Sequence, residues 1–217
     1  MRQILARAVP DHGVHGEEHG LHLASAPYRW VLDPIDGTRA YISGFPTWVT
    51  LIALLYQGEP LLGLIDAPAV NVTVLGLVCD AGVHRAGAYQ LVGQALEPLA
   101  ARPCSSLDRA TLATTGPELL PSPAIREAWW RACEKSRLQR YGGDGFAYAL
   151  LARGLIDAVV EAGLKPYDLA APLAVVRAAG GIATSFDGGD PLQSGQVIAA
   201  GDPRVHAALR LIFASAG

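Results

Sequence analysis

Cysteine is scarce in this sequence: Cys79, Cys104 and Cys133 are far apart and form no C-x-x-C pair. Neither a disulfide framework nor a thiolate zinc site is therefore expected, and a reducing cytoplasm is the favoured compartment. Long apolar runs are also missing, because no stretch reaches the roughly eighteen apolar residues of a membrane span. The apolar run after Met1 is too short for a signal peptide. We therefore predict a cytoplasmic protein with no membrane partner.

Basic clusters are equally rare, since no basic run exceeds a pair and the net charge is -3. Binding to a phosphate backbone depends on clustered Lys and Arg, so no nucleic-acid partner is expected. Apolar residues, by contrast, make up 51% of the chain. A chain of this length can bury about 70% of the surface that its unfolded form exposes, so its core needs no disulfide or structural metal. We expect one domain over residues 1–217, with a strand-rich half (1–110) and an α/β half (111–217).

The apolar periodicity predicts different elements in the two halves. Residues 1–28 are rich in Gly and His and predict a loop or a strand end. Strands are then expected at 28–32, 48–56, 61–67, 73–78 and 82–86. The second half predicts strands at 111–115, 155–161 and 182–186, and helices at 122–136, 146–153 and 169–179.

The segment Asp33-Pro34-Ile35-Asp36-Gly37-Thr38 follows the first predicted strand and is expected to end it in an exposed turn. Two carboxylates three residues apart on a sharp turn can converge on one point, with the Ile35 carbonyl between them. Ligation by oxygen alone suits a hard cation such as Mg²⁺. A capped turn after a buried strand is the alternative interpretation.

Two further acidic segments say little when each is taken alone. Gly16-Glu17-Glu18 is compatible with a solvated acidic turn. Asp168, in Lys165-Pro166-Tyr167-Asp168, is predicted as the N-cap of an apolar helix, where it would accept from free backbone amides.

Taken in order, G-E-E, D-P-I-D-G-T, x-D-x-A-A and A-G-G resemble the signature set of the inositol monophosphatase family. The resemblance runs from about Asp11 to the C-terminus. Residues 144–148 and 161–168, and also 42–44 together with 50–55, resemble the histidinol-phosphate phosphatase branch in particular. The implied fold is an α/β (α+β layered) arrangement of alternating helix and sheet layers. The family begins with two long helices, and this sequence is expected to lack them.

The resemblance also implies the site residues. Two or three Mg²⁺ ions would be held by Glu17, Asp33, the Ile35 carbonyl, Asp36 and Asp168. Gly37 and Thr38 would contact the phosphate, and Thr38, Asp36 and Glu17 would act in catalysis. The implied reaction is hydrolysis of a small-molecule phosphate ester by activated water, without a phosphoenzyme. Homodimers are common in the family, so a homodimer is expected.

Substrate choice is expected at Asp144, Glu161 and Lys165. Carboxylates near the metal would favour the ammonium and imidazole of L-histidinol phosphate through charge-assisted hydrogen bonds. Inositol 1-phosphate, or another ester used in the family, is the alternative substrate. Asp144 and Glu161 could instead be a helix N-cap and a strand-end charge.

The expected absence of the two helices affects both activity and surface. They carry a Thr and an acidic pair that complete the pocket, and Thr38 alone is a poor base. We therefore expect a slow phosphatase with an exposed apolar face. A pseudoenzyme that binds metal or phosphate and acts as a partner subunit is the alternative from another functional class.

A histidine-rich segment raises a second metal hypothesis. His15-Gly16-Glu17-Glu18-His19 matches the H-x-x-E-H pattern of some zinc proteases, which requires a helix. Its glycines disfavour a helix by about 1 kcal/mol each relative to Ala. Adventitious transition-metal binding by His12, His15, His19 and His22 remains an option.

Overall fold

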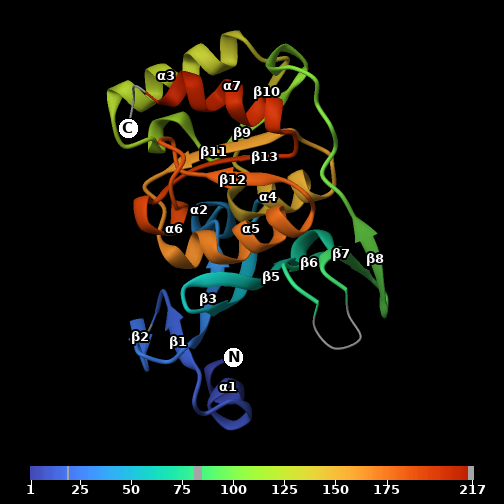
Figure 1. Cartoon of the computed structure of the whole chain (residues 1–217), viewed down its shortest axis with the longest axis vertical. Helices are drawn as coiled ribbons and strands as arrows, with labels where there is room; N and C mark the ends of the chain where they lie inside the picture. Colours follow the sequence, from blue (N-terminus) through green and yellow to red (C-terminus); the bar gives the residue numbers. More distant parts are fainter. Residues whose placement is uncertain (19, 81–84, 215–217) are drawn as a thin grey trace.

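A computed structural model describes residues 1–18, 20–80 and 85–214 of the chain (Figure 1). The first half forms an eight-stranded sheet in the order β2-β1-β3-β4-β5-β6-β7-β8. All neighbouring strands are antiparallel except β1 and β3. The strands are β1 (Gly13–Gly16), β2 (Gly20–His22), β3 (Tyr28–Asp36), β4 (Val49–Tyr56), β5 (Glu59–Ala67), β6 (Val72–Leu77), β7 (Gly87–Val92) and β8 (Ala95–Leu99).

The second half forms a five-stranded mixed sheet in the order β10-β9-β11-β13-β12. Strand β9 is parallel to β10 and β11, whereas β13 is antiparallel to β11 and β12. Parallel neighbours need a crossover connection, and helices supply it here. The strands are β9 (Thr111–Thr114), β10 (Leu138–Tyr141), β11 (Ala158–Ala162), β12 (Ile182–Thr184) and β13 (Gln196–Ala200).

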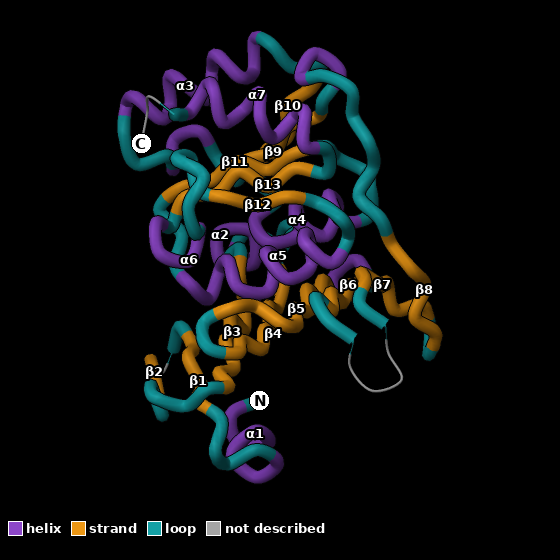
Figure 2. The backbone as a smooth tube through the Cα atoms, viewed as in Figure 1, coloured by secondary structure: helices purple, strands orange, loops and turns teal. Residues whose placement is uncertain are grey.

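Helices separate and cover the sheets in layers (Figure 2). Helices α4 (Asp144–Ala152) and α5 (Pro166–Ala178) lie between the two sheets, and α3 (Pro123–Glu134) and α7 (Pro203–Phe213) cover the far face of the second sheet. One apolar core lies between the sheets and the other lies beneath α3 and α7. The layered α/β fold expected from the sequence is thus confirmed. Short helices complete the chain: α1 (Arg2–Ala8), α2 (Thr38–Ile42) and α6 (Pro191–Ser194).

Helix α5 lies unusually close to the first sheet because two strand positions have no side chain. A methyl group at Gly63 in β5 would overlap the Ala171 carbonyl, and one at Gly76 in β6 would come within 2.5 Å of the Val175 Cα. Glycine in a strand commonly marks such a close backbone approach. These two glycines therefore set the depth of α5 and of every side chain that it carries.

The structure differs from the predicted elements at several points. Strand β3 does not stop before Pro34 but continues to Asp36, and its pairing with β4 shifts between Asp33 and Asp36. The shift is a bulge, where a proline is tolerated because no ladder N–H is needed. Helix α1 and strands β1 and β2 occupy residues 1–28, where a loop or strand end was expected. The strand expected at 82–86 lies mostly outside the described residues. None of the described helices has the length and apolarity needed to cross a bilayer.

Candidate active site

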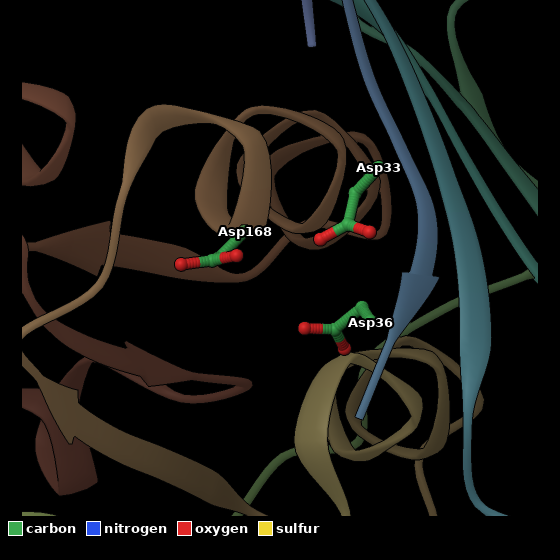
Figure 3. Close-up of side chains that lie close together, drawn as sticks. All are labelled: Asp33, Asp36 and Asp168. Carbon is green, nitrogen blue, oxygen red and sulfur yellow. The ribbon is translucent and has the colours of Figure 1, made fainter. Parts of the chain in front are cut away.

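Three carboxylates from distant parts of the chain converge between the layers (Figure 3). Asp33 and Asp36 come from the bulged end of β3, and Asp168 comes from the first turn of α5. One oxygen of each lies within 4.8 Å of the others, the one group of possible metal ligands found among the described residues. Oxygen-only donor sets suit hard divalent cations. The three aspartates therefore fit a magnesium site.

Asp33 is buried, with 2% of its surface exposed, so the expectation of an exposed turn was wrong for this residue. The backbone N–H of Ile35 donates to its Oδ1 at 3.0 Å and fixes the turn. Burial, followed by the charges of Glu17 and Asp168, raises the pKa of Asp33 to about 7. A cation between the carboxylates would relieve this repulsion.

Asp36 is joined directly to the start of α4. The Gly145 N–H donates to its Oδ2 at 2.6 Å, and a Cβ at Gly145 would lie 2.6 Å from that same oxygen. Only glycine therefore fits there. Burial raises the pKa of Asp36 well above its usual value, and the Gly145 hydrogen bond opposes that rise.

The sequence predicted Asp168 as the N-cap of α5, and this prediction was wrong. Lys165 holds that position, and Asp168 is the third helical residue of a capping box. The Lys165 backbone N–H donates to Asp168 Oδ2 at 2.7 Å. One carboxylate oxygen is thus held by the cap, and the group faces the other two aspartates from a rigid helix. Burial raises the pKa of Asp168.

The remaining residues predicted around the metal lie beside this group. Glu17 is exposed and borders a hollow of about 410 Å³ together with Pro34, outside the group of three. It is close enough for its charge to raise the pKa of both Asp33 and Asp168. The Thr38 hydroxyl donates to the Ile35 carbonyl at 3.3 Å.

A hollow of about 260 Å³ opens next to the aspartates. Its lining includes two of the clustered aspartates, Asp36 and Asp168, together with Asp144, Glu161 and Tyr148. Glu161 is buried in β11, not a solvated strand-end charge, and burial raises its pKa to about 7. Burial also raises the pKa of Asp144. The hollow therefore combines two of the candidate metal ligands with a second acidic pair, Asp144 and Glu161.

Asp144 is not a helix N-cap, because Gly143 holds that position in α4. It has a positive φ of 43°, which is strained for a residue with a side chain. Gly37 also has a left-handed φ of 81°, and a Cβ there would lie 3.2 Å from the Asp144 carboxyl group. The Lys165 side chain, by contrast, is exposed and does not line the hollow.

Sequence reasoning gave no role to Thr115 or Tyr148. The Thr115 N–H and hydroxyl both donate to Glu161 Oε1, at 2.9 and 2.8 Å. Tyr148 is buried, and its hydroxyl has no hydrogen-bond partner among the described residues. Its position four residues after Asp144 in D-G-F-A-Y places both side chains on one helix face, a signal that could have identified it.

The histidines do not gather into a metal site in the described part of the chain. His12 accepts a hydrogen bond from the Trp30 indole at 3.1 Å and stacks on Tyr28. His15 contacts Tyr167 edge to face, and His22 is exposed on β2. His19 lies outside the described residues. Residues 13–16 form a strand rather than the helix that H-x-x-E-H requires.

Comparison with known proteins agrees with this geometry. The Arabidopsis thaliana protein "Bifunctional phosphatase IMPL2, chloroplastic" is 41% identical over 95% of this chain, which spans 60% of that protein's length. A Mycobacterium tuberculosis histidinol-phosphatase is 35% identical over 87% of this chain and 70% of its own. An inositol monophosphatase structure from Zymomonas mobilis has a TM-score of 0.86 at 36% identity, covering 98% of this chain and 79% of that one. The model of the inositol monophosphatase family matches residues 1–215, and the chain belongs to that family.

Proposed function

We propose that this chain is a magnesium-dependent phosphomonoesterase whose substrate is a small phosphate ester with a cationic group, L-histidinol phosphate in the first instance. The observation that carries the proposal is the junction of two acidic sets in one hollow. Asp36 and Asp168 belong to the cluster of possible metal ligands, and Asp144 and Glu161 line the same hollow.

Magnesium held by Asp33, Asp36 and Asp168 would supply Lewis-acid stabilisation of the phosphoryl oxygens and activate water. Glu17 and the Ile35 carbonyl are proposed to contribute to a second or third ion. The chain's own groups do the positioning. Gly145 and Lys165 each donate a backbone N–H to an aspartate and hold its remaining oxygen toward the centre.

Gly37 and Thr38 are proposed to meet the phosphate at the start of α2. The left-handed backbone at Gly37 turns the chain there beside the Asp144 carboxyl group. Because the Thr38 hydroxyl donates to the Ile35 carbonyl, its lone pairs are free to accept a hydrogen bond from the attacking water. Thr38 would thus orient the water rather than deprotonate it.

The second acidic pair, Asp144 and Glu161, supports a cationic substrate. Glu161 is buried and accepts both of its hydrogen bonds on Oε1 from Thr115, which leaves Oε2 available. A buried carboxylate is stabilised by an opposite charge, and the ammonium of histidinol phosphate provides one. A polyol would offer only neutral hydroxyl groups. Inositol 1-phosphate is therefore the second candidate, and relatives named for each activity are known.

The test measures phosphate release from histidinol phosphate, inositol 1-phosphate and glycerol 2-phosphate, with Mg²⁺ and with EDTA. We expect histidinol phosphate to have the highest kcat/KM and EDTA to abolish all turnover. Glu161→Gln should lower kcat/KM for histidinol phosphate by about 10- to 150-fold, the range for a hydrogen bond to a charged group. Loss on the neutral esters should be much smaller.

Glu134→Gln, an exposed change at the end of α3, is the matched control and should alter nothing. Equal losses on cationic and neutral esters in Glu161→Gln would assign Glu161 a structural role. A preference for inositol 1-phosphate would select the second candidate. Hydrolysis of none of the esters would favour the pseudoenzyme. A homodimer and a cytoplasmic location stay predictions.

A further inference from the structure

A second hollow, of about 380 Å³, lies away from the aspartates and is lined by four arginines, Arg102, Arg109, Arg137 and Arg204. It borders Asp157, which directly precedes β11, and Arg102 is held there through that carboxylate. Strands β9 and β11 are parallel, so their starts share one edge of the sheet and Thr115 and Glu161 lie at the other. Four residues separate the two ends, roughly 13 Å along a strand. The basic hollow is therefore distinct from the proposed active site.

The two carboxylates that pair with arginines of this hollow, Asp157 in its lining and Asp202 behind Arg204, each accept several hydrogen bonds from the protein. Asp157 accepts from Arg102 Nε and Nη2 at 2.7 and 2.6 Å and from the Thr111 N–H at 2.7 Å. Asp202 accepts from Arg204 Nε and Nη2 at 2.9 and 2.7 Å, and also from backbone N–H groups, including that of Cys104 at 3.0 Å. Neither group is left to attract a cation.

The arginines, in contrast, keep unused donors. Arg109 and Arg137 are exposed, and neither forms an ion pair with a carboxylate among the described residues. Arg137 donates one hydrogen bond, to the Thr111 hydroxyl at 3.0 Å. Each guanidinium has five N–H donors, and the ion pairs of Arg102 and Arg204 use only Nε and Nη2. Four guanidiniums, set against Asp157 in the lining and Asp202 paired with Arg204, leave an excess of two positive charges.

We propose that this basic hollow binds the phosphate group of a small anion, at a site separate from the three aspartates. Guanidinium groups match the oxygens of a phosphate in pairs, which gives both charge and geometry. The volume is within the usual range for small-ligand pockets. The ligand is either inorganic phosphate or a small phosphate monoester, because both present the same group.

The experiment titrates the full chain with inorganic phosphate and, separately, with glycerol 2-phosphate, by calorimetry in EDTA. Without metal, the clustered aspartates repel an anion, so the titration reports the basic hollow. We expect saturable binding of one anion per chain. Tighter binding of glycerol 2-phosphate than of phosphate would identify an ester as the ligand, and the reverse would identify free phosphate.

The paired change Arg109→Gln and Arg137→Gln should weaken this binding about tenfold or more, since it removes charged donors. The matched control changes Arg7 and Arg140 to Gln, two exposed arginines that do not line the hollow. It removes the same charge and should leave the affinity unchanged. Changing Arg109 and Arg137 to Lys keeps the charge but loses the planar fork, and should weaken binding by an intermediate factor. Equal weakening in the Gln pair and its control, or no saturable binding at all, would overturn the proposal.

Discussion

The two sheets of this protein are buried in different ways. In β4 of the first sheet, buried residues such as Leu51 and Ala53 alternate with half-buried ones such as Ile52 and Leu54. In the second sheet all five residues of β11, Ala158–Ala162, are buried. Alternation is typical of a sheet with one face on the core, and a continuous apolar run is typical of one covered on both faces. The first sheet packs on α5, whereas the second has helices on either side.

This difference is matched by a division of labour in the proposed site. The first sheet supplies Asp33 and Asp36 from the end of β3, where a bulge interrupts its regular pairing with β4. The second supplies Glu161 from within a fully buried strand, braced by Thr115. We infer that the first sheet governs metal-dependent chemistry and the second governs substrate choice.

The largest effect should come from changing one of the three clustered aspartates that the first sheet and α5 supply. Asp36→Asn removes a charge from the metal group and weakens a Lewis-acid contribution of several kcal/mol, so kcat for every ester should fall by about 10³-fold. In EDTA the same variant should be at least as stable as the wild type, because one of three repelling carboxylates is gone. Steady-state kinetics and thermal unfolding measure both. Ordinary turnover in Asp36→Asn would remove Asp36 from the proposed site.

A smaller effect should follow from changing the distance between the first sheet and α5. Gly63→Ala forces a methyl group into the Ala171 carbonyl and should lower the free energy of unfolding by about 1–3 kcal/mol. It should also weaken magnesium binding, because α5 carries Asp168. Leu64→Ala, on the opposite face of β5, should destabilise the protein without changing magnesium affinity. Denaturant unfolding and magnesium titration separate the two. An unchanged magnesium affinity in Gly63→Ala would contradict this account.

A smaller effect on activity is expected at Tyr148, which lines the same hollow as Asp144 and Glu161. Because its buried hydroxyl has no partner among the described residues, Tyr148→Phe should leave stability unchanged or raise it. The kcat/KM should nevertheless fall about three- to tenfold, if the hydroxyl contacts the bound substrate. Tyr56→Phe, an exposed change on β4, is the control. A loss of stability with unchanged kinetics would show that the hydroxyl serves the fold.

The effect that varies least near neutral pH concerns Asp157, a carboxylate at the other end of the second sheet. Burial tends to raise the pKa of Asp157, but the hydrogen bonds from Arg102 and Thr111 outweigh it and lower the pKa below its usual value. A lowered folded-state pKa contributes stability above the unfolded value, and that contribution is lost as pH falls through the folded one. The advantage of wild type over Asp157→Asn should therefore be constant near pH 7 and shrink below about pH 4. Urea unfolding across pH 3–7 measures it, and a constant difference would refute it.

The sequence predicted the parts of the site that are local in the chain. The D-P-I-D-G-T segment places Asp33 and Asp36 three residues apart, and their convergence was predicted from this spacing on a sharp turn. The burial of Asp33 could not be predicted in the same way. It depends on how closely α5 packs on the first sheet, which is set by two glycines far from Asp33 in sequence.

Elements with weak local patterns were also missed. Strand β10 is short, polar and mostly exposed, so neither alternation nor an apolar run marks it. The brace between Thr115 and Glu161 joins residues 46 apart, and neither residue type predicts its partner. Long-range pairings of this kind need the sheet order, which a single sequence does not contain.

Strands β9 and β11 are joined by carboxylates at both ends, Asp157 to Thr111 and Glu161 to Thr115, each across 46 residues. Both strands are buried on both faces, so sliding one past the other by a residue would move none of their side chains from the core into solvent. Side-chain burial alone therefore identifies the correct register only weakly. A one-residue slip would, however, remove from two buried carboxylates the hydrogen bonds that Thr111 and Thr115 donate, which is costly for each. During folding, the acidic residues proposed for specificity and for structure would act together to reject misaligned pairings of these strands.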